Sequence, residues 1–411
     1  MGSVRLGTGK KARVQAAELE CDMATTRTAF DFDTIVSRQD TGSLKWEKFS
    51  QDVLPLWVAD MDFACPEAVS RKVMERARHP IYGYNTQPDS LMESIIGWVK
   101  RRHHWDIKRE WIVLSPGVVT SVILSILALS KPGDGVIIQP PVYHPFFSII
   151  RDNEREMVEN PLLFSNGRYE IDFKHLEQTL ADRKNRLLLL CSPHNPVGRV
   201  WTRDELTRVY QLCRQNKVDV LADEIHCDVV FGGHKHTVFA SLATPVSEQC
   251  ITFMSASKTF NLPGLNCSFM VIPCQRRRSL VDGWLNRLHI SRNNLFGVLA
   301  MEAAFRNGDS WLDTLLPYLE ENVNMMIDFA RTRLPGVKVI KPEGTYMAWL
   351  DFREHFTSAT ELDDFLMQKA KVGINRGVTF GRQGEGFARL NFAVPRSRLL
   401  EALTRIEKAI G

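Results

Sequence analysis

A lysine after a short run of small hydroxyl residues is the first candidate for chemistry. Lys258 stands in Ser255-Ala-Ser257-Lys258, directly after the apolar segment 251–254. Small residues let a loop approach an anion closely, and the two serine hydroxyls can donate hydrogen bonds to it. A lysine that loses its proton in such surroundings can form a Schiff base with a carbonyl compound. For this motif alone, a surface lysine with no chemical role is an equal alternative.

Two further polar side chains follow apolar segments. Asp223 follows segment 218–222, and Asn195 lies in the turn after segment 186–191. Ligands of α/β sheets bind at the carboxyl ends of the strands. A carboxylate buried there needs a cationic partner, and the protonated ring nitrogen of pyridoxal phosphate is one. The Asn195 amide could donate to a phenolate oxygen. A helix cap for Asp223 and a plain turn at Asn195 remain the alternatives.

An arginine interrupts an apolar segment near the end of the chain. Arg389 lies within residues 387–393, which are otherwise mostly apolar. A buried guanidinium favours a planar anion, and a carboxylate matches its fork of N–H groups. A carboxylate of a ligand and an internal salt bridge are both open at this point.

The segments that must position these residues alternate between two kinds. Short apolar stretches predict strands, and between them amphipathic stretches at 118–129 and 202–216 predict helices. This alternation is typical of a mainly parallel sheet that is covered by helices. The last hundred residues predict an α+β lobe with a long helix at 311–333, broken near Pro317. The predicted strands are 111–114, 135–139, 186–191, 218–222, 251–254 and 268–272.

Taken together, the four signals resemble the fold-type I pyridoxal-phosphate enzymes, in which Asn, Asp, Lys and Arg appear in this order. The matching motifs are Asn195-Pro-x-Gly198, Asp223-Glu, Ser255-x-Ser-Lys258 and Arg389-Leu-Asn. The resemblance implies an aspartate-aminotransferase-like α/β fold, with a mainly parallel seven-stranded sheet in a large domain and a smaller α+β domain. We expect the large domain at 73–309, the small domain at 23–72 and 310–411, and a disordered extension at 1–22.

Longer segments are similar to the MalY/PatB group of cystathionine β-lyases, which are C–S lyases. This resemblance implies a pyridoxal-phosphate enzyme that acts on L-cystathionine or related cysteine S-conjugates. The products would be a thiol, pyruvate and ammonia. The segments are Asp40-Thr-Gly-Ser-Leu-Lys-Trp46, Leu56-Trp-Val-Ala-Asp-Met-Asp-Phe63, Tyr82-Gly-Tyr84, Pro140-Pro-Val-Tyr143-His-Pro-Phe146 and Asp223-Glu-Ile-His-Cys-Asp228.

The resemblance also implies roles around the cofactor ring. Lys258 forms the Schiff base with the cofactor and later moves the Cα proton. Asp223 pairs with the ring nitrogen. Asn195 and His226 lie near the O3′ oxygen, and Tyr143 stacks on the ring face. Class I aminotransferases usually carry tyrosine where this chain has His226, so that position favours the lyase branch.

The cofactor phosphate is implied to bind at a helix N-terminus and beside the lysine. Unpaired backbone N–H groups and the helix dipole both favour an anion there. Many aminotransferases add an arginine eight residues after the lysine, whereas this chain has Asn266. The implied phosphate residues are Gly117, Val118, Val119, Ser255 and Ser257.

Two more roles follow from the resemblance. Tyr82 reaches the phosphate of the neighbouring subunit and counts among the catalytic residues, so we expect a homodimer with composite active sites. Arg389 binds the substrate α-carboxylate. Two alternatives stay open: an aminotransferase on the same cofactor, and a lyase with an added transcription-regulatory role.

Composition excludes several other classes. The formal net charge is +4 over 411 residues, which gives no case for a nucleic-acid partner. The longest apolar-looking run, 118–129, is far shorter than the about 20 residues of a membrane span. Eight scattered cysteines without a C-x-x-C pair indicate a reducing compartment, and we expect a cytoplasmic enzyme. His103-His104 and the pair His234 and His236 lack completing ligands in the sequence, so we expect no metal.

Overall fold

The computed structural model describes residues 30–290 and 293–411. Residues Asp31–Gly411 form one compact unit, so the expected boundaries of a large and a small domain stay a prediction. The expected disordered extension at 1–22 lies outside the described residues. Among the described residues, no helix has the length and apolar character needed to cross a membrane.

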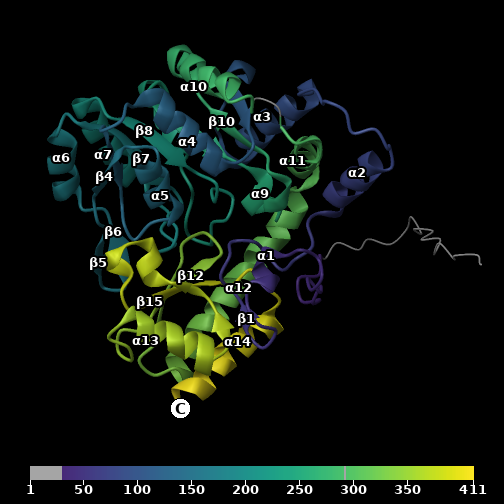
Figure 1. The fold of residues 1–411 in the computed structure, drawn as a ribbon, viewed down its shortest axis with the longest axis vertical. Coiled ribbons are helices and arrows are strands. Elements are labelled where there is room, and N and C mark those ends of the chain that lie inside the picture. Colours follow the sequence, from purple (N-terminus) through teal and green to yellow (C-terminus); the bar gives the residue numbers. More distant parts are fainter. Residues whose placement is uncertain (1–29, 291–292) are drawn as a thin grey trace, which may run out of the picture. The chain divides into compact units, whose positions relative to one another are not determined.

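The candidate site is built on a seven-stranded sheet (Figure 1). Its members are β2 (Ile112–Ser115), β3 (Gly135–Ile138), β4 (Glu156–Glu159), β7 (Asn185–Cys191), β8 (Asp219–Asp223), β9 (Cys250–Met254) and β10 (Ser268–Val271). The order across the sheet is β2-β10-β9-β8-β7-β3-β4. Only β10 runs antiparallel to its neighbours, so the predicted mainly parallel sheet of seven strands is confirmed.

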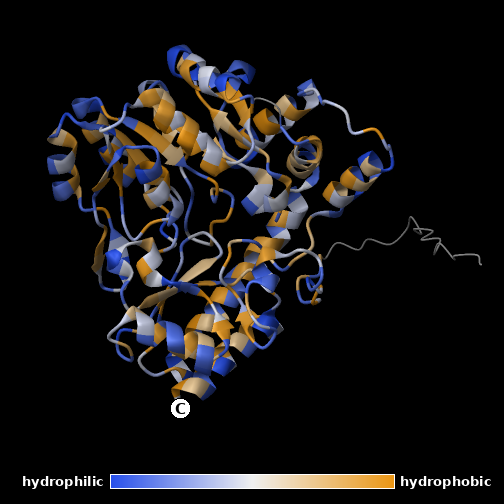
Figure 2. Ribbon diagram, viewed as in Figure 1, coloured by the Kyte–Doolittle hydropathy of each residue, from blue (hydrophilic) through white to orange (hydrophobic). Residues whose placement is uncertain are grey.

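Both faces of the central strands are buried, which explains why β3, β7, β8, β9 and β10 are mostly apolar, whereas the edge strand β4 is partly exposed and carries two glutamates. Leu187 and Leu189 belong to one hydrophobic cluster, while Leu188 and Leu190 belong to the other. Successive side chains of a strand point to opposite faces, so each face needs its own cover. Figure 2 shows the strands as hydrophobic and many outer helix surfaces as hydrophilic.

Helices supply that cover. On one face these are α4 (Val118–Leu129), α5 (Pro145–Asp152) and α10 (Gln275–Arg287). On the other face these are α3 (Asp89–His103), α6 (Phe173–Ala181), α7 (Arg203–Asn216) and α11 (Leu295–Asn307). Thr202 and Glu205 form a capping box at the start of α7, as the spacing of these two residues predicts.

A smaller sheet of order β11-β12-β15-β14 follows in the last part of the chain. Its members are β11 (Lys338–Ile340), β12 (Met347–Asp351), β14 (Asn375–Arg376) and β15 (Phe387–Asn391). Beside it lie α12 (Asp309–Arg333), α13 (Ala359–Asp364) and α14 (Arg396–Ile410). The predicted break near Pro317 is wrong, because α12 continues through it. A proline removes one backbone hydrogen bond, and the buried Leu315 and Leu319 hold the helix in place on either side.

The remaining elements are short or lie at the edges. Strand β1 (Leu54–Pro55) pairs with β13 (Val372–Gly373), and β5 (Leu163–Ser165) pairs with β6 (Arg168–Glu170). The helices are α1 (Leu44–Glu47), α2 (Glu67–Ala77), α8 (Thr244–Ser247) and α9 (Ala256–Thr259).

One glycine joins the two sheets close to the candidate site. The backbone carbonyl of Gly198 accepts hydrogen bonds from the N–H groups of Glu343 and Gly344, at 2.8 and 3.0 Å. Gly198 has φ +72°, and a Cβ atom there would lie 2.6 Å from the Cβ of Pro342. Only glycine fits both demands, and this turn also carries Asn195.

We therefore expect Gly198→Ala to destabilise the protein. A positive φ costs alanine about 1–2 kcal/mol, and overpacking adds about 1–3 kcal/mol. Gly233→Ala is the matched control, since Gly233 has φ +85° but no atom within 4 Å of the added Cβ. Urea unfolding of both variants measures the difference, and equal losses of stability would show that the contact with Pro342 is unimportant.

Candidate active site

A cavity of about 270 Å³ lies at the carboxyl ends of β7, β8 and β9, beside the first residues of α4. Parallel strands place their carboxyl ends on one edge, and ligands bind there. Ten of the residues proposed from the sequence line this cavity. They are Gly117, Val118, Val119, Tyr143, Asn195, Asp223, His226, Ser255, Ser257 and Lys258.

Lys258 lies on α9, immediately after β9, and is only partly exposed. Its Nζ donates a hydrogen bond to the Ala59 carbonyl at 2.6 Å. Desolvation lowers the pKa of the lysine to about 8, although the nearby Asp60 carboxylate acts in the opposite direction. A sizeable fraction of Lys258 is therefore neutral close to physiological pH, as a nucleophilic amine must be.

Asp223 ends β8 and carries a carboxyl group without a cationic side chain within ion-pair distance among the described residues. Its Oδ1 accepts one backbone hydrogen bond, from Ile225 at 3.2 Å. Burial raises the pKa of Asp223 to about 7. A protonated ring nitrogen would supply the missing positive charge, so the residue fits a pyridine-type cofactor.

His226 is buried, and its Nδ1 has no hydrogen-bond partner among the described residues. Desolvation, with the positive charges of Lys258 and Arg389, lowers its pKa to about 3, so the imidazole is neutral. A buried ring nitrogen without a partner is costly unless a ligand supplies the missing hydrogen bond. The orphaned nitrogen is thus a second feature that fits a bound polar group.

Arg389 lies at the centre of β15 and is 2% exposed. Its guanidinium donates to three neutral oxygens: Asn195 Oδ1 at 3.0 Å, Trp57 O at 2.9 Å and Asn375 Oδ1 at 2.7 Å. No carboxylate of the described residues pairs with it, and its Nε is unpartnered. The alternative of an internal salt bridge is therefore wrong, and the cation remains available for a ligand carboxylate.

Asn195 connects Arg389 with the cavity. Its Oδ1 accepts from the arginine, which leaves the amide hydrogens for a different acceptor in the cavity. This arrangement is compatible with donation to a phenolate oxygen. Tyr143, whose ring also lines the cavity, packs edge-on against Phe146 with ring centroids 5.6 Å apart. Burial raises the pKa of Tyr143 to about 12, so its hydroxyl stays protonated.

The first turn of α4 offers an anion site. Its first intrahelical bond is donated by Ser121 to Gly117 O, so the N–H groups of Val118, Val119 and Thr120 have no partner within the helix. These three residues line the cavity. Thr120 was missed from the sequence, although a hydroxyl in the first turn of a helix next to Gly117 is a usable signal.

The two serines beside Lys258 differ. The Ser255 hydroxyl donates to Cys267 O at 2.8 Å and also accepts from Ser257 N at 3.0 Å. Its proton is thus already committed to the protein, and Ser257 is the better hydroxyl donor of the two. Asn266 also lines the cavity, in the place where an arginine was expected in aminotransferases.

Tyr82 is not among the residues that line this cavity. It is 58% exposed, and its hydroxyl donates to Ala77 O at 2.8 Å. Its ring contacts Phe296, with centroids 5.8 Å apart. The role foreseen for Tyr82 lies in a neighbouring subunit, so it stays a prediction.

One backbone carbonyl near Lys258 was not predicted. Ala59 O accepts from Lys258 Nζ and also from the hydroxyl of the fully buried Tyr346, at 3.1 Å. Tyr346 is not among the residues proposed from the sequence. Its contact with the acceptor of Lys258 lies across 287 residues of chain, which no local pattern can reveal.

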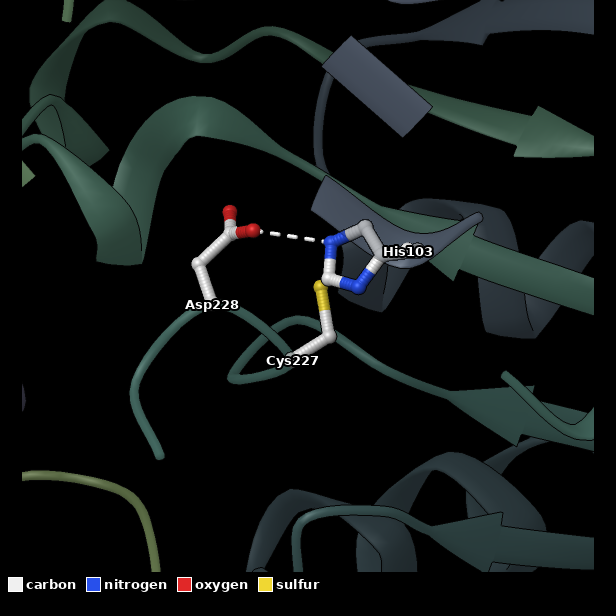
Figure 3. A group of neighbouring side chains, drawn as sticks. All are labelled: His103, Cys227 and Asp228. Carbon is white, nitrogen blue, oxygen red and sulfur yellow. Dashed lines mark hydrogen bonds and ion pairs between the residues drawn. The ribbon is translucent and has the colours of Figure 1, made fainter. Parts of the chain in front are cut away.

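Next to Thr259 of α9, the fold brings together His103, Cys227 and Asp228 (Figure 3). The sequence spacing gave His103 no neighbouring metal ligands. The fold instead places Cys227 and Asp228 beside its ring, so that part of the prediction is wrong. The Asp228 carboxylate, however, already accepts three hydrogen bonds, from His103 Nε2 at 2.8 Å, Trp98 Nε1 at 3.1 Å and Thr259 Oγ1 at 2.6 Å. A metal ion would have to displace these donors, so the group is better explained as a structural network.

This network holds α9 in place. Asp228 follows β8, His103 and Trp98 belong to α3, and Thr259 is the neighbour of Lys258. Burial raises the pKa of Asp228, but hydrogen bonding and the charge of His103 lower it more, so the net shift is downward. A buried ionised carboxylate with full hydrogen bonding therefore ties α9 to two other elements.

Comparison with known proteins identifies relatives of the whole chain. The family Aminotransferase class I and II matches residues 51–406. Cystathionine beta-lyase PatB of Bacillus subtilis (strain 168) is 42% identical, over 93% of this chain and 100% of PatB. The structure of cystalysin from Treponema denticola, which contains pyridoxal 5′-phosphate, has a TM-score of 0.89 and 36% identity, covering 93% of this chain and 98% of cystalysin.

A second solved structure is also similar. The pyridoxal-phosphate-bound putative aminotransferase from Clostridium difficile 630 has a TM-score of 0.91 and 43% identity, covering 93% of this chain and 100% of the other. The fold similarity therefore extends over nearly the whole of both chains.

We expect Asp228→Asn to destabilise the protein strongly. Removing the charge of a buried charged network costs about 3–5 kcal/mol, because asparagine keeps only one acceptor oxygen and turns the other into an NH2 donor that faces a donor of the network. Asp313→Asn is the matched control, since Asp313 is 59% exposed, pairs with Arg102 and should cost about 1 kcal/mol or less. Chemical unfolding without cofactor compares the two, and a similar small effect for both would refute the network's structural role.

Proposed function

The chain belongs to the class I and II aminotransferase family, and we propose that it is a pyridoxal-phosphate-dependent C–S β-lyase acting on L-cystathionine or related cysteine S-conjugates. Its products would be a thiol, pyruvate and ammonia. The observation that carries this proposal is the 42% identity to the cystathionine β-lyase PatB over its entire length. The site geometry supports the same chemistry independently.

The cavity residues fit the cofactor. Among the described residues, Asp223 has no cationic side chain within ion-pair distance, the Nδ1 of His226 has no hydrogen-bond partner, and the first turn of α4 has N–H groups without a partner within the helix. We assign the ring nitrogen to Asp223, the ring hydroxyl side to Asn195 and His226, and the phosphate to the helix start. When bound, pyridoxal 5′-phosphate supplies an electron sink for the pair left at Cα.

Arg389 and Lys258 have the roles closest to the substrate. Arg389 would bind the α-carboxylate by its free Nε and a neighbouring N–H group, which fixes the orientation of the substrate. Lys258 Nζ would accept the proton from Cα, since its lowered pKa leaves it neutral and basic near pH 8. The electron pair at Cα then expels sulfur from Cβ, and the leaving thiolate takes up a proton. Water hydrolyses the released aminoacrylate to pyruvate and ammonia.

An aminotransferase remains the second candidate. It is favoured by the similarity to the putative aminotransferase from Clostridium difficile. Both reactions begin with removal of the Cα proton by the lysine. They differ in whether Lys258 returns that proton to another carbon or the sulfur group departs first. No observation on the described residues supports the regulatory alternative.

A homodimer with composite sites also forms part of the proposal. Side chains of apolar character are exposed around the segment between α2 and α3, where Met74, Ile81 and Tyr82 are 58%, 67% and 58% exposed. Clustered exposed apolar groups of this kind mark protein interfaces. A second copy that covers this surface would bring Tyr82 close to another subunit's phosphate site.

A reducing compartment, the cytoplasm, completes the proposal. Seven cysteines of the described residues are free thiols, and five of them are buried. Burial raises the pKa of the Cys213 thiol and the Cys250 thiol, so these groups are inert fillers of the core.

Purified protein should form pyruvate from L-cystathionine without any keto acid. Lys258→Ala should lose at least roughly 1000-fold of this activity, because the nucleophile and the proton acceptor are both removed. Lys408→Ala, at an exposed position of α14, is the control and should keep full activity. Turnover that depends on added 2-oxoglutarate or pyruvate, with no pyruvate released from L-cystathionine alone, would identify an aminotransferase instead.

Composite sites predict complementation between two inactive variants. Tyr82→Ala and Lys258→Ala should each be inactive alone. Mixed dimers contain one site with both substitutions and one with neither, so equal co-expression should restore about one quarter of the wild-type activity. The assay is pyruvate release, with mass spectrometry to confirm that mixed dimers formed. Full activity of Tyr82→Ala alone, or mixed dimers without activity, would contradict the assignment of Tyr82.

A further inference from the structure

A second cavity, of about 600 Å³, adjoins the first. The two share Ala59, Lys258 and Pro263 as lining residues, so both cavities lie against the lysine side chain. The first cavity must hold the cofactor ring and the α-amino acid end of a substrate. A long substituent on sulfur therefore needs additional space, and the second cavity provides it.

Four charged side chains form a network at this second cavity. Arg38 Nη2 lies 2.7 Å from Asp60 Oδ2, and Arg38 Nη1 lies 2.8 Å from Asp62 Oδ1. Lys45 Nζ lies 3.1 Å from Asp62 Oδ1. Two cations and two anions balance, so the network has no net charge.

The inner and outer halves of the network differ in exposure. Lys45 and Asp62 are 0% and 2% exposed, as expected for a buried structural pair. Arg38 and Asp60 remain 23% and 16% exposed, and both line the cavity. The outer pair thus presents one cation and one anion, side by side, to any ligand that enters.

Both members of the outer pair have unused hydrogen-bonding capacity. A carboxylate can accept about four hydrogen bonds, whereas Asp60 accepts two, both from Arg38. The Nε–H of Arg38 makes no hydrogen bond within the part of the chain that the structure describes. An ammonium could therefore bind Asp60, and a carboxylate could bind Arg38, without breaking the pair.

We propose that the second cavity binds the distal α-amino acid group of a long thioether substrate, with Asp60 holding its ammonium and Arg38 its carboxylate. This inference rests on the proposed lyase function and specifies its substrate class. A zwitterion carries one positive and one negative group a few ångströms apart. These two charges are opposite to those of Asp60 and Arg38, which lie side by side. The group that departs with sulfur would then be an amino acid thiol, and Asp60 and Arg38 would determine specificity without taking part in bond breaking.

The test compares substrates that differ only in the distal group. L-Cystathionine has the distal ammonium and carboxylate, S-(3-carboxypropyl)-L-cysteine has the same length but lacks the ammonium, and S-methyl-L-cysteine lacks both. Asp60→Asn should lower kcat/KM for L-cystathionine by roughly 10-fold or more, since the charged acceptor of the distal ammonium becomes a neutral amide. It should change kcat/KM for the other two substrates by less than about 2-fold.

Arg38→Met should lower kcat/KM for both substrates with a distal carboxylate and spare S-methyl-L-cysteine. Asp60→Glu should restore part of the L-cystathionine activity, and Asp52→Asn, at an exposed carboxylate, is the control. Because the Asp60 carboxylate also raises the pKa of Lys258, each rate constant is taken at the plateau of its own pH profile. Circular dichroism verifies that each variant is folded.

The outcomes separate the two claims. Equal losses for all three substrates in Asp60→Asn would overturn the specificity role and leave the lyase function intact. Unchanged turnover of L-cystathionine by both Arg38→Met and Asp60→Asn would likewise overturn the specificity role and leave the lyase function intact. A wild-type protein that releases pyruvate from none of the three thioethers would reject the lyase function, and the inference with it.

Discussion

The buried guanidinium of Arg389, held without an anion of its own, is the constraint on which the site depends. An arginine that is 2% exposed is costly to desolvate, and neutral oxygens offset only part of that cost. Those oxygens come from Trp57, Asn195 and Asn375, which are 332, 194 and 14 residues away in the chain. The correct placement of two distant segments and of the neighbouring strand β14 is thus required to keep this one charge in position.

Other ionisable groups of the first cavity also lack full charge compensation. Lys258, Asp223 and His226 are all shifted toward their neutral forms by desolvation, and the described side chains do not compensate them fully. Such shifts destabilise the unliganded protein and become favourable when a ligand supplies the opposite charge. A cofactor with a cationic ring nitrogen and an anionic phosphate, followed by a substrate carboxylate, matches the uncompensated groups one by one. Binding of the ligands should then contribute directly to the stability of the folded state.

Sequence patterns predicted well whatever depends on the ends of strands. Asp223, Asn195 and Lys258 each follow an apolar segment, and parallel strands bring their carboxyl ends to one edge, so these residues had to meet there. The seven-stranded sheet and the cavity confirm that reasoning. The anion that Arg389 binds could not be predicted, because an internal salt bridge and a ligand site give the same sequence pattern. Only the positions of the surrounding carboxylates distinguish them.

Patterns failed where a contact joins segments that share no periodicity. Asp228 meets His103 across 125 residues, and Ala59 accepts a hydrogen bond from Lys258 across 199 residues. Neither pairing follows from spacing, since each depends on how helices pack on the sheet. Ser255 shows a different limit: its residue type suggested a phosphate donor, but its proton is used by Cys267 O.

In the proposed mechanism, catalysis and specificity are carried out by different groups. The first steps of elimination and of amino transfer require the same groups, Lys258 and Arg389, at the same Cα atom. What differs among thioether substrates lies beyond Cβ, outside the region those groups contact. The second cavity begins at that point, and its charges come from the segment 38–62 rather than from the sheet edges. That segment holds Lys258 and Arg389 through the backbone carbonyls of Ala59 and Trp57, so side chains that line the second cavity can change to suit a new leaving group while these backbone contacts stay the same.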